Sequence, residues 1–99
     1  MEIRIQPIHF ELSQQLEAFI QKKTSKLEQY HEGIQSADVV LKVIKPETAN
    51  NKDVSVKLNV PNQDFFATKT ADSFEEALDH VVEALEKQVL KFKEKQRTK

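Results

Sequence analysis

The 99-residue sequence contains no cysteine and only one glycine. Without cysteine the chain has no disulfide framework, no thiolate nucleophile and no cysteine-based zinc site. A single glycine argues against a glycine-rich loop that would hold a phosphate through backbone N–H groups. The N-terminal stretch MEIRIQPIHF has no long apolar run, so it resembles neither a signal peptide nor a membrane span. We therefore expect a soluble cytoplasmic protein with one domain over residues 1–99.

The sequence also lacks the patterns that accompany catalysis or metal binding. Its three histidines, His9, His31 and His80, form neither an HxH nor an HExxH motif. Asp79 precedes His80 on a predicted helix, where adjacent side chains point apart. The paired carboxylates occur only on one helical face, which we expect to be solvated. We expect neither an enzyme nor a bound metal or cofactor.

Hydrophobic periodicity predicts elements in the order β-α-β-β-β-α. The predicted strands are residues 2–8, 37–45, 53–60 and 65–70, and the predicted helices are 13–30 and 73–95. A right-handed crossover should make the first two strands parallel, and hairpins should make the remaining pairs antiparallel. The predicted fold is an α+β two-layer sandwich, in which both helices cover one face of a four-stranded mixed sheet.

Local signals mark where these helices begin and end. Ser13 is a suitable N-cap for the first helix, and Ser73 forms a capping box with Glu76 at the start of the last one. Gly33 is expected to end the first helix in the left-handed conformation, which glycine adopts without steric cost. The alternation in residues 53–60 points Val54, Val56, Leu58 and Val60 inward. The alternation in residues 65–70 points Phe65 and Ala67 inward, and a slip of one residue would bury Phe66 instead.

The last helix changes the sign of its charge along its length, although the whole chain has a formal charge of −1. Its first half carries Asp72, Glu75, Glu76, Asp79, Glu83 and Glu86, and its second half carries Lys87, Lys91, Lys93, Lys95, Arg97 and Lys99. Acid early and base late complement the helix dipole, but that effect fades beyond the last turn. Lys87, Lys91 and Lys95 also repeat every four residues and form one ridge. The pattern is consistent with either a solvated helix end or an anion-binding surface.

Three further lysines, Lys22, Lys23 and Lys26, cluster in the second half of the first helix. Lys22 and Lys26 share a face, whereas Lys23 falls near the middle of the apolar stripe. Lys23 is either a side chain that extends to solvent at the sheet edge or a cation held rigidly by a packed stem. The pattern alone does not decide between these two interpretations.

The solvent-facing side of the sheet is predicted to carry Arg4, Lys42 and Lys57. An antiparallel sheet with one hydrated face normally carries such residues. Phe66 is expected either to be a half-buried strand aromatic or to stand among these cations as a platform on which a base stacks.

Three segments of the sequence resemble one family. KLEQY (26–30), VVLKV (39–43) and DSFEEALDHVVEALEKQVLKFKEK (72–95) are similar to the ribosome hibernation-promoting factors, also called ribosome-associated translation inhibitors or sigma-54 modulation (S30EA) proteins. In the last segment Lys91 and Lys93 match the family pattern, and Lys87 replaces its arginine. Ser73 stands at the usual aspartate position, and the Glu75–Glu76 pair replaces an aromatic-alanine pair. The likeness covers nearly the whole chain, in the short form of the family.

This resemblance implies the β-α-β-β-β-α fold and binding to the small ribosomal subunit, in the channel used by mRNA and by the A- and P-site tRNAs. The bound factor would inhibit translation in stationary phase or starvation. The implied ribosomal RNA contacts are Lys23, Lys26, Lys87, Lys91, Lys93 and Lys95, with Lys22, Lys42 and Arg97 beside them. The short form would lack a C-terminal dimerisation domain and be monomeric off the ribosome. Its partners would be ribosomal RNA and neighbouring ribosomal proteins, with no membrane and no small-molecule substrate.

Two other functions remain open from the sequence. A protein-interaction module would use the two-helix face or a sheet edge and would show no salt-sensitive affinity for RNA. A general double-stranded RNA binder would bind a plain duplex as tightly as it binds ribosomes.

Overall fold

The computed structural model describes residues 1–44, 51–61 and 63–97, with the side chains of the last helix described as far as Lys93. The elements are β1 (Glu2–Pro7), α1 (Gln14–Ser25), a short 3-10 helix η1 (Lys26–Gln29), β2 (Ser36–Val43), β3 (Lys52–Val60), β4 (Gln63–Ala71) and α2 (Phe74–Arg97). The predicted order of strands and α-helices is confirmed. Most of the loop predicted before β3 lies outside the described residues.

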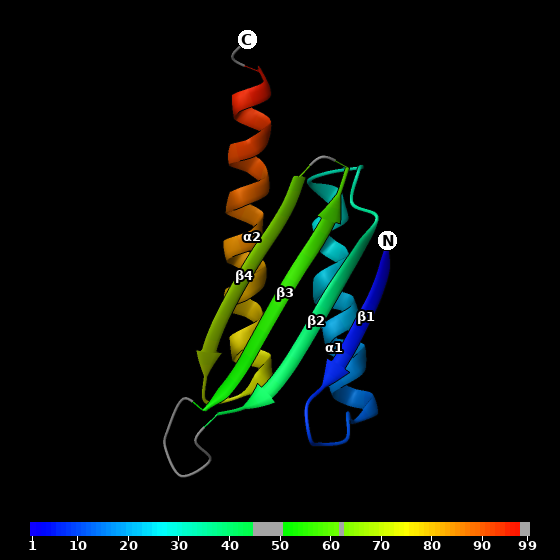
Figure 1. Ribbon diagram of the computed structural model, residues 1–99, viewed down its shortest axis with the longest axis vertical. Coiled ribbons are helices and arrows are strands. Elements are labelled where there is room, and N and C mark those ends of the chain that lie inside the picture. Colours follow the sequence, from blue (N-terminus) through cyan, green and yellow to red (C-terminus); the bar gives the residue numbers. More distant parts are fainter. Residues whose placement is uncertain (45–50, 62, 98–99) are drawn as a thin grey trace.

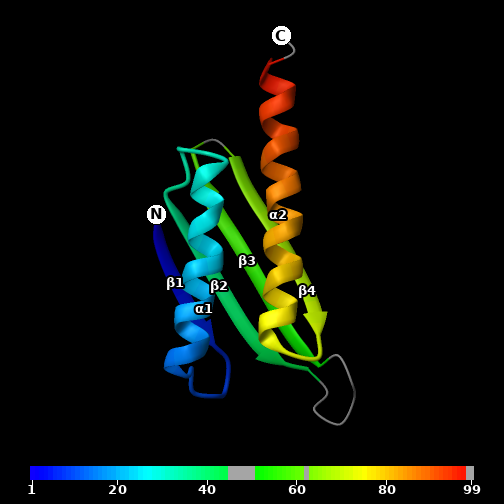
Figure 2. The same ribbon diagram turned by 180° about the vertical axis from the view of Figure 1, so that it is seen from behind.

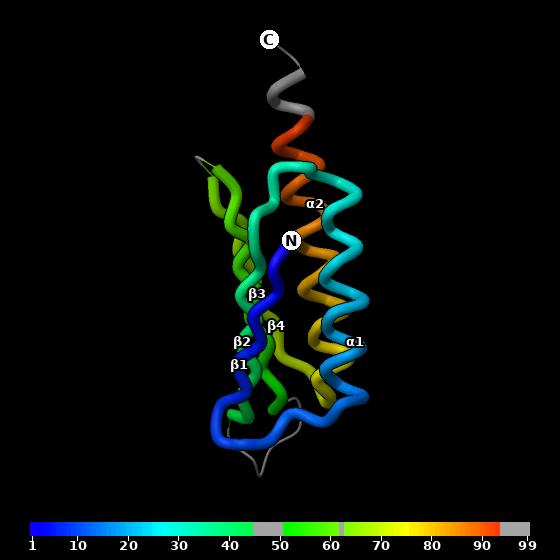
Figure 3. Tube along the Cα trace, turned by 90° about the vertical axis from the view of Figure 1, so that its right-hand side faces the viewer, coloured from blue at the N-terminus to red at the C-terminus, as the bar shows by residue number. Residues whose placement is uncertain are grey.

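The four strands form one mixed sheet in the order β1-β2-β3-β4 (Figure 1). β1 pairs in parallel with β2, so that Ile3 lies opposite Ala37, and the other two pairs are antiparallel. Both α-helices cover the same face, as Figures 2 and 3 show. The predicted two-layer sandwich is therefore confirmed, and the parallel β1–β2 pair with it.

The predicted hand of the β1-α1-β2 crossover is wrong. In Figure 1 the helices lie behind the sheet, β1 runs downward, and β2 lies to the left of β1, which makes the connection left-handed. Two constraints account for this exception to the usual preference. One edge of β2 is already paired with β3, so β1 has to add to the other edge. The helix α1 then has to cross on the apolar face, which α2 also covers.

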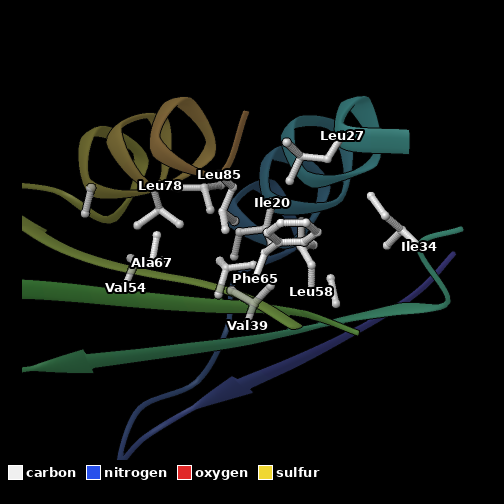
Figure 4. Packing of buried hydrophobic residues seen from close by; sticks show 14 of the residues in the cluster. Ile20, Leu27, Ile34, Val39, Val54, Leu58, Phe65, Ala67, Leu78 and Leu85 are labelled. Carbon is white, nitrogen blue, oxygen red and sulfur yellow. The ribbon is translucent and has the colours of Figure 1, made fainter. Parts of the chain in front are cut away.

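The hydrophobic core lies between the sheet and the helices (Figure 4). The alternation predicted for the third strand is confirmed, because Val54, Val56 and Leu58 are fully buried. They face α2, whose Leu78 and Leu85 are also fully buried. Burying each leucine side chain is worth about 1.5–3 kcal/mol, so these contacts fix α2 across β3 and β4. Neither α-helix is long and apolar enough, over its described residues, to cross a membrane.

Both predicted N-caps are confirmed. The backbone N–H of Leu16 donates to the Ser13 hydroxyl oxygen at 3.1 Å, and that of Glu76 donates to the Ser73 hydroxyl oxygen at 3.1 Å. Each serine thus satisfies one of the N–H groups that a helix leaves without an internal partner. The start of α2, and with it the register of its charged residues against the sheet, is fixed in this way.

Gly33 has a different role from the one predicted. The chain leaves α1 at Ser25 and the 3-10 helix at Gln29, and Gly33 does not have a positive φ. Its N–H donates to Nδ1 of His31 at 2.8 Å, and a Cβ at Gly33 would lie only 2.7 Å from Cε1 of that ring. The glycine is therefore needed because the His31 ring packs directly against the backbone.

Thr24 of α1 gives a first test of this packing. It is fully buried, and within the described part of the chain its hydroxyl has no hydrogen-bond partner. Thr24→Val replaces the hydroxyl with a methyl group of similar size, so we expect the free energy of unfolding to rise by about 1 kcal/mol. In a domain of this size the melting temperature would rise by roughly 4–8 °C. Thermal unfolding followed by circular dichroism measures this, and a fall in melting temperature would contradict it.

Candidate nucleic-acid interface

The C-terminal turns of α2 run past the end of the sheet and carry exposed lysines (Figure 1). Phe92 secures the start of this projection. Its ring meets that of Phe65 edge-on, with 5.5 Å between centroids, and lies 6.1 Å from the ring of His31. Lys91 and Lys93 flank Phe92 and are both exposed. The side chains of Lys95 and Arg97 lie outside the described part.

Lys87 and Lys91 both lie on the side of α2 that faces the edge strand β4. Lys87 lines an open hollow of about 350 Å³ with Lys69 of β4 and with His80, Glu83 and Ala84 of α2. Lys91 lines a second hollow of about 460 Å³ with Gln63 and Phe65 of β4 and with Gln88 and Phe92 of α2. Part of the predicted basic ridge therefore follows the seam between β4 and α2.

Lys93 belongs to the opposite side of the same helix. It lines a hollow of about 340 Å³ with Gln29, His31, Glu32 and Gly33, next to the turn that leads into β2. The described basic residues at the end of α2 thus lie on two sides of the helix. A polyanion that wraps around the projecting end would therefore meet positive charge on both sides of α2.

Lys23 of α1 and Lys26 of η1 face the acidic half of α2. Lys23 and Lys26 line a groove between the helices together with Asp79, Glu83 and Glu86. The Lys23 ammonium lies 3.3 Å from a carboxylate oxygen of Asp79 and 5.6 Å from the centre of the Phe19 ring. Lys23 is thus a cation held by a packed stem, and its nearest partner is a carboxylate. Part of the acidic half of α2 therefore faces lysines and not solvent alone.

Tyr30 also lines this groove. A hydrogen bond to the Glu86 carboxylate, followed by burial, raises the pKa of the Tyr30 hydroxyl. The phenol therefore stays neutral and keeps Glu86 directed into the groove. Lys22 lies outside the groove and is exposed on α1.

Arg4, Lys42 and Lys57 project from the open face of the sheet, as predicted, and all three are exposed. Lys42 lies opposite Asp53 in the β2–β3 register, and the Lys57 ammonium lies 3.7 Å from the carboxylate of Asp64. These acidic neighbours offset much of the positive charge on this face.

Arg4 is held by a carboxylate in the same way. Its Nε lies 2.6 Å from Oδ1 of Asp38, and the Asn59 side-chain amide donates to the other carboxylate oxygen at 2.9 Å. The hydrogen bond from Arg4, followed by that from Asn59, lowers the pKa of Asp38, and the same contact raises the pKa of Arg4. Arg4 therefore ties β1 to β2 and offers little free charge.

The structure shows the exposure of two residues of β4, Lys69 and Phe66, which the sequence patterns left undecided. Lys69 occupies an inward position of β4 by alternation, yet it is exposed, because an edge strand leaves its side chain room to reach past α2. Phe66 lies on the open face and is 55% exposed, so it is a half-buried strand aromatic whose ring also remains accessible. A lysine at an inward position of an edge strand is the sequence signal that would have pointed to the first.

The hollows described on this α+β sandwich are open and are lined largely by charged and polar side chains. In the described residues no group of three or more His, Asp or Glu side chains is placed to hold a metal ion. The chain belongs to the Sigma 54 modulation protein / S30EA ribosomal protein family, whose model matches residues 3–97. The resemblance found in the sequence is thereby confirmed.

Individual relatives and solved structures agree with this assignment. The ribosome hibernation promoting factor of Pseudomonas putida is 26% identical over 98 residues, which cover 99% of this chain and 92% of the relative. The N-terminal domain of Protein Y from Thermus thermophilus superposes with a TM-score of 0.81 at 22% identity, over 93% of this chain and 99% of that one. A ribosomal subunit interface protein from Coxiella burnetii gives 0.83 at 20% identity, over 94% and 98%. These two structures show that the fold is shared.

Proposed function

We propose that this protein is a ribosome hibernation factor that binds the small ribosomal subunit and inhibits translation. The observation that carries the proposal is the family match over residues 3–97. The names of the relatives, a hibernation promoting factor and a subunit interface protein, support it. The binding site would be the channel of the mRNA and of the A- and P-site tRNAs, and the ligand would be ribosomal RNA phosphates. The factor would act in the cytoplasm during stress or stationary phase, without catalysis.

The end of α2 supports an electrostatic mode of binding. Lys87, Lys91 and Lys93 are exposed, and the helix projects past the sheet, so it can enter a cleft lined with phosphates. A local basic surface attracts RNA even when the net charge is −1, because nearby charges dominate the field. The proposed contacts are Lys22, Lys23, Lys26, Lys42, Lys87, Lys91, Lys93, Lys95 and Arg97.

The contacts on α1 require an exchange of partners. Lys23 would leave Asp79 for a phosphate, or would bind the phosphate while the carboxylate stays close. The two side chains are 31% and 52% exposed, and ion pairs at the surface contribute only about 0.2–1 kcal/mol, so the exchange costs little. The acidic residues of the groove would also weaken binding to RNA in general, which favours a site of matching shape. We propose that residues 1–99 act as one binding domain and are monomeric off the ribosome.

Sedimentation with purified small ribosomal subunits at increasing salt tests this function. If six of the nine proposed residues contact phosphates, the log–log slope of affinity against salt would be roughly −4 to −5, because each contact releases condensed counterions. Translation in a purified system should be inhibited at the concentrations that give binding. A slope near zero would favour the protein-interaction module instead. Equal affinity for a plain RNA duplex would favour a general double-stranded RNA binder.

A further inference from the structure

The seam between β4 and α2 forms a track of positive charge with few carboxylates. Its two hollows are lined by Lys69, Lys87 and Lys91, and among the described residues Glu83 is the one carboxylate that lines either of them. Glu83 lies 3.5 Å from Lys87, but the two side chains are 64% and 77% exposed. So exposed a pair is weak, and a phosphate competes with it easily. The Lys69 ammonium has no carboxylate within 4 Å in the part of the chain that the structure describes.

An exposed aromatic ring lies on the same edge. Phe66 projects from β4 onto the open face, where 55% of it is accessible. Its backbone carbonyl accepts a hydrogen bond of 2.9 Å from the side-chain amide of Gln88, which also lines the hollow of Lys91. This bond ties α2 to β4 and holds the backbone of Phe66 in place. The nearby Lys57 already has Asp64 as its partner.

We propose that an unpaired RNA strand binds along this edge, with its phosphates on Lys69, Lys87 and Lys91 and one base stacked on Phe66. The strand backbone lies against the side of β4 that carries α2, and the base reaches over the edge to the open face. A single strand suits this arrangement because stacking on a side chain requires a base that is not already within a duplex. This inference rests on the proposed function and specifies which kind of RNA the surface takes.

The first test removes Lys69, which no sequence pattern assigned to the interface. Fluorescence anisotropy would measure the affinity of wild type and Lys69→Ala for a short, unstructured RNA oligonucleotide at several salt concentrations. We expect weaker binding by Lys69→Ala and a log–log slope that is smaller by about 0.7, the value for one lost contact to a single strand. Lys52→Ala removes the same charge from β3, outside the proposed contacts, and should leave both affinity and slope unchanged. Equal behaviour of the two variants would overturn the proposal.

The second test separates stacking from charge. Phe66→Ala should weaken binding of the oligonucleotide by between about 5- and 150-fold without changing the salt slope, because the lost contact is not ionic. Phe66→Tyr keeps the aromatic face and should bind like wild type. The same sequence annealed to its complement should bind more weakly than the single strand. Wild-type affinity in Phe66→Ala, or tighter binding of the duplex, would overturn the proposal.

Small ribosomal subunits distinguish the two proposals. If wild type sediments with the subunits while both alanine variants bind the oligonucleotide like wild type, the proposal of a single-strand site is wrong and the proposed function stands. If both variants bind the oligonucleotide more weakly than wild type but wild type does not sediment with the subunits, the single-strand site is supported and the proposed function is wrong. If wild type binds no oligonucleotide, the proposal of a single-strand site is wrong, whether or not the protein sediments with the subunits.

Discussion

Lys87→Glu/Lys91→Glu is expected to weaken binding to the small ribosomal subunit by about 100-fold or more. Both side chains are exposed on the seam between α2 and β4, so the substitution removes two cations that face outward. It also sets two negative charges against the phosphates, and like charges brought together cost several kcal/mol. The salt slope should become shallower by roughly 2, since about one unit disappears with each contact. Sedimentation at several salt concentrations measures both quantities, and inhibition of translation should fall in parallel.

A matched control has to carry the same change in net charge. Lys52→Glu/Lys57→Glu reverses two lysines of β3 that lie outside the proposed contacts, and thermal unfolding should show that both variants are folded. We expect this control to bind subunits far better than the α2 variant. If the control and the α2 variant bind subunits equally, the loss of affinity comes from net charge alone, and the lysines at the end of α2 are solvated and do not bind RNA. If the α2 variant binds like wild type, the electrostatic mode of binding is wrong.

The sequence was sufficient to predict the parts of the fold that depend on local pattern. Alternation in β3 predicted that Val54, Val56 and Leu58 face inward, and all three are fully buried. Ser13 and Ser73 were predicted as N-caps, and both cap because their hydroxyls lie within reach of a free N–H two or three positions on. These features depend on residues only a few positions apart, so the sequence alone is enough to predict them.

Other features depend on residues that only the folded chain brings together. Gly33 is needed because of the His31 ring, which packs against its backbone, and not because it stops a helix. The contact between Lys23 and Asp79 joins two elements that are 56 residues apart in the chain (79 − 23), and no spacing rule relates them. Alternation places Lys69 on the inward face of β4, and only the position of β4 at the edge of the sheet explains why its side chain is exposed. Each of these features required the arrangement of the helices over the sheet.

The sign change along α2 can now be understood from its surroundings. The acidic half lies beside α1, where Asp79 and Glu86 line the groove that holds Lys23 and Lys26. The basic half begins where α2 approaches the end of the sheet and continues beyond it. Compensated charge thus lies between the helices, and exposed lysines with few carboxylate neighbours lie on the seam and, as far as Lys93, on the projecting end. This distribution permits local attraction of RNA at a net charge close to zero.

Phe92→Ala is expected to weaken both the fold and the interface, because Phe92 secures the projecting end of α2. Its half-buried ring packs against Phe65 and His31. Truncation of a fully buried phenylalanine costs about 3–5 kcal/mol, so a loss of about 2 kcal/mol is expected here. The melting temperature would fall by roughly 10 °C. Thermal unfolding measures this loss, and Phe92→Leu should recover most of it.

The effect on binding follows from the length of helix left without support. A few helical turns that do not pack on anything are marginal in water, so the turns around Lys91 and Lys93 should fray in Phe92→Ala. Their amide hydrogens would exchange faster, and ordering them again on RNA would lower the affinity for small subunits by roughly tenfold. Leu90→Ala is the matched control, because Leu90 is 45% exposed on the same turn and its truncation should change little. If Phe92→Ala loses stability but binds like wild type, the lysines do not need a preformed helix, and the interface is set by charge alone.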